Sequence, residues 1–344
     1  MSQNSCGCGT TVCQISPAAS PEPVKGTLSI QLTWRDVVGG WRVRWGWGRM
    51  HYRIAPGLYR IGQPDADSPV LVTANYKFTV DKVRRQLAGL DVWLLVLDTK
   101  GVNVWCAAGK GTFGTGELVQ RIQAVNLPAM VKHRELVVPQ LGATGIAAHE
   151  VKRASGFTVH YGPVRAQDIR AYLAAGMKAS PEMRRVSFHW KERLVLAPVE
   201  IVGGLKNMAP VLVVLAVLDA VRHHRLTPHL LADFAPFLAA VLAGGLAVPL
   251  LLPWLPSRYF AVKGTAAGAV LAAVLWCLLP MGRLEAVGIA LLVLAITAYM
   301  AMMFTGSTTF TTLAGAKLEV RRALPPILVA AAVGAILRLT AAFV

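Results

Sequence analysis

The residue best suited to chemistry is a single cysteine, Cys106, in the middle of a stretch rich in glycine and alanine. The stretch runs from Val102 to Glu117 and reads V-N-V-W-C-A-A-G-K-G-T-F-G-T-G-E. No second cysteine lies near it in the sequence. Three roles remain open for such a cysteine: a buried structural residue, a nucleophile, or a thiolate ligand to a metal.

The neighbours of Cys106 favour the ligand. A hydrophobic run at 91–98 leads into the stretch, and a helix-like segment at 118–125 follows it. Ala107, Ala108 and Gly109 would leave a flat face against which a large planar macrocycle can lie. A helix-like turn would then direct the Cys106 sulfur at a metal in that macrocycle.

A glycine pattern in the same stretch offers a competing interpretation. Gly109, Gly111 and Gly114 match the dinucleotide fingerprint G-x-G-x-x-G. In that fold the first glycine follows its strand almost at once, and an acidic residue ends the next strand. Here Gly109 lies far beyond Asp98, and the next strand ends in Val-Pro-Gln. The spacing therefore disfavours a nucleotide site, and a Walker pattern is absent.

Alternating strand and helix signals surround this stretch from Pro69 onwards. Short apolar runs separated by helices predict a doubly wound, Rossmann-like α/β domain that binds ligands at its strand ends. The loops there hold Thr73, Asp98, Gly142 and Gly162, of which the glycines would let a ligand approach the backbone. The expected strands are 70–73, 92–97, 135–138, 158–161 and one near 194–196; the expected helices are 80–87, 118–125, 146–154 and 166–175.

A change in composition near residue 200 predicts a second domain. Residues beyond 200 carry only 10 of the 35 Lys and Arg and 4 of the 18 Asp and Glu. The predicted domains are therefore 69–200 and 201–344, the second all-α and transmembrane. Each of its apolar runs approaches the roughly 20 residues that cross a bilayer as a helix. The five expected spans are 201–221, 231–252, 261–281, 284–304 and 323–343.

The net charge of +17 could indicate nucleic acid as a partner. No nucleic-acid motif is visible, and a membrane protein with a basic cytoplasmic side explains the same charge. The loop charges and the basic first domain predict a multi-pass protein of the cytoplasmic (inner) membrane with the first domain in the cytoplasm. The Ser/Thr-rich gap at 305–322 then faces the cytoplasm, either as a plain loop or against a polar cofactor edge.

The first 68 residues form a separate predicted region. Residues 1–27 read as a polar, disordered tail whose Cys6, Cys8 and Cys13 could bind a soft metal ion or do little. Five cysteines in all, an odd number, favour a reducing compartment. The Trp/Arg-rich stretch 34–60 could lie at the membrane interface or pack on the domain as a loop.

The eight residues 103–110, N-V-W-C-A-A-G-K, resemble the signature of the mercury-methylation corrinoid protein (HgcA) family. The segment 304–311, F-T-G-S-T-T-F-T, is similar to a second stretch of that family, and a corrinoid domain followed by five spans is its architecture. The resemblance covers roughly residues 69–344. More distantly, the first domain resembles the corrinoid-binding part of the corrinoid iron–sulfur protein.

The resemblance implies a cofactor and its site. The cofactor would be cobalamin or a related corrinoid, bound without its own lower base, with Cys106 as cobalt ligand and catalytic residue. The D-x-H-x-x-G pattern of histidine-ligated corrinoid proteins is absent, as this implies. Together with Gly142 from the strand-end loops, the expected lining is Asn103, Val104, Trp105, Ala107, Ala108, Gly109 and Lys110 from the signature, and Thr73, Thr79 and Ala166 by family similarity.

The resemblance also implies an activity, the transfer of a methyl group from Cys-ligated methylcobalamin to inorganic Hg(II) to give methylmercury. A ferredoxin-like iron–sulfur partner would re-reduce cobalt, and the methyl donor would be a methylated folate. An alternative is a corrinoid methyl carrier of one-carbon metabolism with a different acceptor. A third is a transporter with a regulatory nucleotide-binding domain, which polar residues at mid-span would mark.

Overall fold

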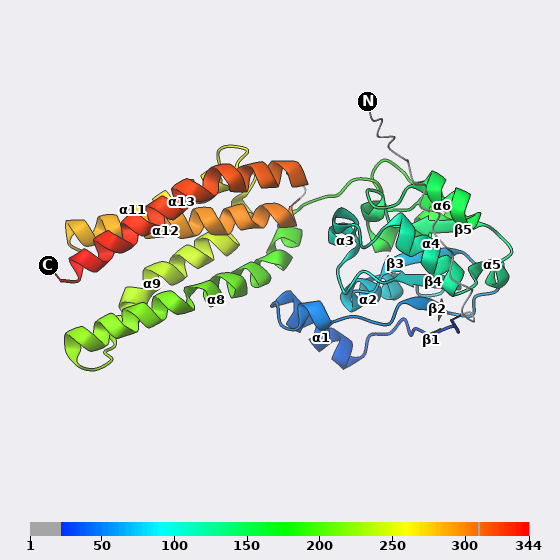
Figure 1. Ribbon diagram of the computed structural model, residues 1–344, viewed down its shortest axis with the longest axis horizontal. Coiled ribbons are helices and arrows are strands. Elements are labelled where there is room, and N and C mark those ends of the chain that lie inside the picture. The colour runs from blue at the N-terminus through cyan, green and yellow to red at the C-terminus, as the bar shows by residue number, and fades with distance from the viewer. Residues whose placement is uncertain (1–21, 309, 344) are drawn as a thin grey trace, which may run out of the picture. The chain divides into compact units, whose positions relative to one another are not determined.

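The structure, a computed structural model, describes residues 22–308 and 310–343 (Figure 1). Cys6, Cys8 and Cys13 therefore lie outside the described residues. The chain divides into two compact units. An α/β unit contains Met1–Asp36 and Met50–Arg184, and a helical unit contains Val37–Arg49 and Arg185–Val344. The predicted boundary at residue 200 falls inside a helix, and the division lies before that helix begins.

The α/β unit is built on a six-stranded sheet with the order β1-β2-β4-β3-β5-β6. Strands β3, β4, β5 and β6 are parallel, whereas β2 pairs antiparallel with β4. The order reverses between β3 and β5, where doubly wound sheets bind their ligands. The strands are β1 Gly26–Thr27, β2 Gly57–Ile61, β3 Val70–Ala74, β4 Val92–Leu97, β5 Glu135–Val138 and β6 Thr158–Tyr161.

Helices cover both faces of this sheet, because the central strands bury side chains in both directions. All six residues of β4 are buried. One core contains Val72 and Leu95 with residues of α3, α4 and α6, and the other contains Leu71 and Leu94 with residues of α2 and α7. The predicted doubly wound fold is confirmed. The helices are α2 Lys77–Gln86, α3 Val104–Lys110, α4 Thr115–Ala124, α5 Leu127–Met130, α6 Ala148–Ser155 and α7 Ile169–Ala174, with short 3₁₀ turns η1 Arg49–His51, η2 Gln140–Gly142 and η3 Ala166–Asp168.

Two predictions about the chain outside these elements need correction. The strand predicted near 194–196 is wrong, because those residues lie within a helix of 34 residues, α8 Trp190–His223. The stretch 34–60 is neither wholly loop nor unstructured. It contains a helix, α1 Trp34–Arg44, and the strand β2 at the sheet's antiparallel side. Short apolar runs do not distinguish a strand from a buried helix, which explains the first error.

A cluster of four charged side chains fixes the start of α1 within the α/β unit. Asp36 accepts hydrogen bonds from Lys77 and, at 2.7 Å, from Arg84 Nη2. Asp81 pairs with the same two cations, both at 2.8 Å. Burial alone would raise the pKa of Asp36, but the bonds from Lys77, Thr33 and Arg84 outweigh burial and hold that pKa well below its usual range.

We expect this cluster to make the α/β unit sensitive to acid. The stability that Asp36 confers is present above the unfolded carboxyl pKa of about 4, and it is lost as the pH falls through the depressed folded pKa. Asp36→Asn should lower stability at neutral pH by about 1–3 kcal/mol and weaken its loss in acid. Thermal unfolding of the full chain in detergent at several pH values measures the stability at neutral pH and its loss in acid. Asp67→Asn, whose side chain is exposed beside Lys132, is the control; equal behaviour of the two variants would contradict the expectation.

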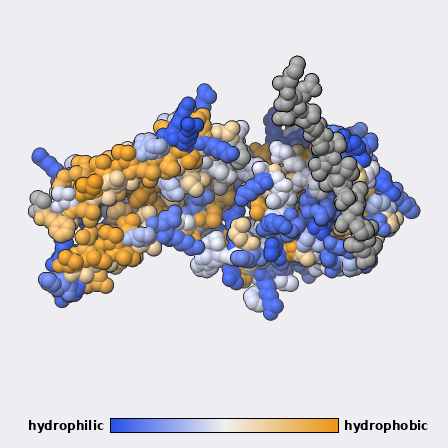
Figure 2. Space-filling view, viewed as in Figure 1, coloured by the Kyte–Doolittle hydropathy of each residue, from blue (hydrophilic) through white to orange (hydrophobic). Residues whose placement is uncertain are grey.

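The helical unit consists of long apolar helices that pack against one another. Within the described residues, five helices are long and apolar enough to cross a membrane, and Figure 2 shows apolar residues covering much of their surface. The fifth helix begins ten residues earlier than its predicted span, because residues 313–322 are helical rather than loop. After α8 the elements are α9 His229–Leu242, the π-helical turn η4 Ala243–Ala247, α10 Val248–Leu251, α11 Phe260–Leu278, α12 Arg283–Met303, the turn η5 Phe304–Ser307 and α13 Leu313–Ala341.

Buried charges in this unit satisfy backbone groups at helix ends. Lys263 Nζ donates to the carbonyl oxygens of Leu252 (2.7 Å) and Leu255 (2.6 Å), and the Glu319 carboxylate accepts from Ala261 N at 2.7 Å. Arg338 Nη2 pairs with Asp233 at 3.1 Å. Water cannot reach polar groups inside an apolar set of helices, so these contacts supply the hydrogen bonds that water would otherwise make. These side chains therefore hold the ends of the helices together.

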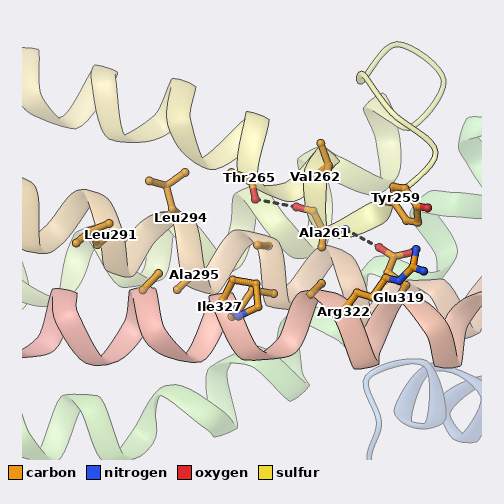
Figure 3. A pocket seen from close by; sticks show the side chains of 14 residues that line it. Tyr259, Ala261, Val262, Thr265, Leu291, Leu294, Ala295, Glu319, Arg322 and Ile327 are labelled. Atoms are coloured by element: carbon orange, nitrogen blue, oxygen red, sulfur yellow. Dashed lines mark hydrogen bonds between the residues drawn. The ribbon is translucent and has the colours of Figure 1, made fainter.

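A groove of about 510 Å³ lies between α11, α12 and α13 (Figure 3). Its wall is apolar along Leu291 and Leu294, and its polar end carries Tyr259, Glu319 and Arg322. A wall of this chemistry suits an acyl chain better than a hydrated ion. The groove is therefore a poor candidate for a site of polar chemistry.

Candidate cofactor site at the carboxyl edge of the sheet

Cys106 lies in the first turn of α3, the short helix that follows β4. The Asn103 side chain caps the helix, with its Oδ1 accepting a hydrogen bond from Cys106 N at 3.0 Å. Gly111 ends the helix at φ 79°, a left-handed conformation in which its N–H reaches the carbonyl oxygens of Ala107 and Ala108. A helix of seven residues has little stability of its own, so the cap and this turn fix the position of the cysteine.

The two faces of α3 differ sharply in burial. Val104, Ala107 and Ala108 are buried in the core of the α/β unit. Trp105, Gly109 and Lys110 are exposed, and Cys106 is half-buried between them. The predicted flat face made by the alanines is therefore wrong, because positions one helical turn apart share a face and the alanines share theirs with Val104. Gly109 is open, with no atom within 4 Å of the position that a side-chain carbon would take.

Two glycines hold α3 and the following loop against η2. A side-chain carbon on Gly145 would lie 2.1 Å from Phe113 O and 3.1 Å from Ala108 Cα. One on Gly142 would lie 2.4 Å from the Phe113 ring. The missing side chain of Gly142 thus makes room for Phe113, and contact between Gly142 and a cofactor remains a prediction.

Asn75, a residue that sequence reasoning missed, organises the loop that leads to α3. Its Oδ1 accepts from Thr99 N (3.2 Å) and Gly101 N (3.0 Å), and it lies 2.9 Å from Thr99 Oγ1. Its Nδ2 donates to Asp98 Oδ1 at 3.1 Å. Asn75 and Thr99 are almost fully buried. The signal available in the sequence was a polar residue directly after the largely apolar run V-L-V-T-A.

Asp98 sits at the end of β4 and anchors the same loop. Burial would raise its pKa, but hydrogen bonds from Lys100 and Asn75 outweigh burial and lower that pKa. Its backbone N–H donates to Glu117 Oε1 at 2.8 Å, and Glu117 in turn pairs with Arg121 at 2.9 Å. Asp98 is therefore an anionic structural anchor at neutral pH.

The remaining predicted lining residues approach the sheet edge from the other face. Thr73 alternates with Val72 and Ala74 along β3, so its side chain points away from α3. Thr79 lies half-buried in the first turn of α2, and Ala166 begins η3, which packs against α2. The predicted residues thus form two groups, on opposite faces of the sheet, that share only its carboxyl edge.

Thr73 carries an observation of its own. Its hydroxyl oxygen is buried and has no hydrogen-bond partner among the described residues. A buried polar group without a partner is costly, and in native structures it commonly marks a ligand or a water position. Thr73 lies at the point where the strand order reverses, so a ligand at this edge could satisfy it.

The glycine pattern lies between two helices rather than after a strand. Gly109 is in the last turn of α3, Gly111 ends that helix, and Gly114 precedes α4. A dinucleotide fingerprint requires a strand directly before its first glycine. The structure therefore agrees with the interpretation that this pattern is not a nucleotide site.

In residues 22–308 and 310–343, no group of three or more His, Cys, Asp and Glu side chains is placed to hold a metal ion. Cys106 is a soft donor, and its side chain is half-buried on the outer face of α3.

Comparisons with known proteins find similarity over part of the chain. Residues 48–173 match the model of the CO dehydrogenase/acetyl-CoA synthase delta subunit family. Subunit gamma of the acetyl-CoA decarbonylase/synthase complex of Methanopyrus kandleri is 40% identical over 123 residues, covering 35% of this chain and 26% of the relative. The corresponding subunit of Archaeoglobus fulgidus is 32% identical over 127 residues, covering 36% and 27%.

These relatives are much longer than the matched region. The chain spans about a quarter of their length. The similarity therefore concerns the α/β unit alone.

Proposed function

We propose that the chain is a membrane-anchored, corrinoid-dependent methyltransferase whose acceptor is inorganic Hg(II), giving methylmercury. The observation that carries the proposal is the placement of Cys106, half-buried on the outer face of a capped helix beside the open Gly109. The signature of residues 103–110 and the relatives of the α/β unit support the corrinoid.

The residues at the sheet edge fit such a cofactor. Cys106 would be its cobalt ligand, which accords with a site that offers one soft donor rather than a cluster. The unpaired Thr73 hydroxyl offers a hydrogen bond to a polar edge of the macrocycle. Asn103, Trp105, Gly109 and Lys110 would contact it from the outer side of α3, and Thr79 and Ala166 from the α2 side.

The bound corrinoid would supply the transferable methyl group. The chain would position the Cys106 sulfur and tune the electron density at the metal. Asn103 holds the first turn of α3 so that the Cys106 sulfur keeps one direction. A thiolate there would donate electron density to the metal, which suits transfer of the methyl with its electron pair to an electrophile such as Hg(II). Axial-ligand choice is the protein's means of tuning a cofactor of this kind. Binding in the base-off form follows from the same proposal, since the sulfur would occupy the lower position.

The partners follow from the chemistry. Re-reduction of cobalt requires a low-potential electron donor, proposed to be a ferredoxin-like iron–sulfur protein, and the methyl donor is proposed to be a methylated folate. The α/β unit would lie on the cytoplasmic side of the inner membrane, as would residues 305–322. Basic residues at that end of the helices, among them Arg258 and Arg321, support this orientation.

A second function is favoured by the comparisons. The relatives belong to the acetyl-CoA decarbonylase/synthase complex, so the chain could instead carry a methyl group within one-carbon metabolism for a different acceptor. The cofactor site would be the same in both cases. Only the acceptor that is methylated by the loaded protein separates them.

Visible spectroscopy of the full chain tests the site. We expect the wild type, reconstituted anaerobically with cobalamin in detergent, to show a cobalt spectrum shifted by the sulfur ligand. Cys106→Ala should bind cobalamin without that shift. Cys277→Ala is the matched control, because Cys277 is exposed in the helical unit, and its spectrum should equal the wild type. Identical spectra for all three proteins would exclude Cys106 as the ligand.

A further inference from the structure

Helix α1 has two faces, and only one of them packs on the protein. Gly40 and Val43 are buried, and Asp36, on the same side of the helix, is held by Lys77 and Arg84. The opposite face carries large apolar side chains in contact with solvent. Exposed tryptophan and valine in this number are unusual on a helix that is already packed.

The exposed residues follow the helical repeat. Trp45 continues the spiral of α1, since its N–H donates to Trp41 O at 3.2 Å. Positions spaced by three, four, seven and eleven residues lie on one side of a helix. The exposed fractions on this side, here called the tryptophan stripe, are Trp34 70%, Val37 47%, Val38 46%, Trp41 60% and Trp45 40%.

Arginines border the tryptophan stripe. Arg35 and Arg42 flank it on one side, and the Arg35 guanidinium stacks 5.6 Å from the Trp34 ring centre. Arg44 lies along the other side. Asp36 is the acidic residue of α1, and it faces away from the stripe in its ion cluster. The outward surface of the helix is therefore apolar at its centre and cationic at its margins.

All of the tryptophan stripe except Trp34 belongs to the same unit as the five candidate membrane spans. Val37–Arg49 groups with the helical unit. Within that unit, a side-chain carbon on Gly46 would lie 3.6 Å from Val199 Cγ2 of α8. Val199 lies within the first three turns of α8, the earliest candidate span. The residues directly after α1 thus pack beside α8 near the start of that helix.

We propose that the tryptophan stripe lies in the interface of a bilayer that contains anionic phospholipid. Tryptophan favours this depth, where its apolar ring is buried and its N–H remains hydrated. Arginines beside an apolar face strengthen the binding of in-plane helices to anionic lipids. The stripe is then an anchor separate from the five spans.

Photo-crosslinking of the full chain in liposomes of phosphatidylcholine and phosphatidylglycerol tests this proposal. A benzophenone amino acid replaces Trp41, and in a matched control it replaces Lys152, which is exposed on α6 of the α/β unit. We expect lipid adducts at position 41 with a yield at least about ten times that at position 152. Mass spectrometry of the crosslinked peptides gives both yields and identifies the lipid.

The charged margin is tested by Arg35→Glu with Arg42→Glu. This double variant should lower the adduct yield at position 41 at least about threefold, as should liposomes of phosphatidylcholine alone. Equal yields at positions 41 and 152 would overturn membrane contact. If the adduct yield at position 41 changes neither in the double variant nor in liposomes of phosphatidylcholine alone, the proposed role of anionic lipid is overturned. In intact cell membranes, adducts at position 41 with protein in place of lipid would assign the stripe to a protein partner and overturn the proposal.

Discussion

Cys106→Ala is expected to lower methyl transfer from the cofactor-loaded chain to Hg(II) by on the order of 100-fold or more. On the proposed function, this substitution removes the cobalt ligand and with it the electron donation that suits transfer to an electrophile. Loss of even an outer contact around a bound metal commonly costs about 10–100-fold. A 100-fold loss corresponds to about 2.7 kcal/mol of transition-state stabilisation. Methylmercury formed in single-turnover reactions, with equal amounts of bound cobalamin, measures the effect.

The controls separate ligation from folding. Cys277→Ala should retain wild-type rates, since its side chain lies outside the α/β unit. Cys106→Ala should also keep the wild-type unfolding temperature, because a half-buried side chain on an exposed face contributes little packing. Full activity in Cys106→Ala would contradict the proposed function, whereas activity towards another acceptor, lost only in this variant, would favour the one-carbon carrier.

Gly145→Ala is expected to destabilise the α/β unit and to displace α3. Its methyl group would meet Phe113 O at 2.1 Å and Ala108 Cα at 3.1 Å, both of them backbone atoms that cannot rotate away. Overpacking of this kind costs about 1–3 kcal/mol and moves the backbone. Because Ala108 belongs to α3, the displacement should also alter the cobalt spectrum that reports on Cys106.

Gly116→Ala provides the comparison for this substitution. It has nothing within 4 Å of the added carbon and lies within α4. In a helix, alanine is favoured over glycine by up to about 1 kcal/mol, so this variant should be as stable as the wild type or more so. Thermal unfolding compares the stability of the two variants, and the visible spectrum of the cobalamin-loaded protein shows whether α3 has moved. A Gly145→Ala protein with unchanged stability and spectrum would show that the loop yields without moving α3.

The parallel part of the fold could be predicted from sequence because its strands are continuous apolar runs between helices. Strands 92–97, 135–138 and 158–161 have the predicted bounds. The antiparallel strand β2 was missed because its pairing with β4 depends on tertiary contact, and G-L-Y-R-I carries little pattern of its own. The apolar run 194–196 misled for the converse reason, since a run of that length is also common inside a long helix.

The candidate site likewise combines features that the local sequence predicts with features that depend on tertiary contacts. The residues around Cys106 in the sequence pointed to it, and the structure leaves it half-buried. Which face of α3 is exposed depends on where the helix begins, and Asn103 sets that start through its cap. The buried roles of Ala107 and Ala108 could therefore not be read from their small size. The long-range hydrogen bonds of Asn75 to residues 98–101 were likewise invisible without the fold.

The discontinuous make-up of the helical unit has a consequence for how the protein is made. Val37–Arg49 leaves the ribosome well before Arg185 does, yet it belongs to the unit that begins there. More than a hundred residues of the α/β unit are therefore synthesised before the rest of the helical unit. During that time the apolar side chains of Val37–Arg49 are exposed. A fragment that stops before α8 would keep Val37–Arg49 without the rest of the unit to which it belongs. Expression of the α/β unit alone should thus start after Arg49, with the loss of the Asp36 ion cluster, or include the membrane helices.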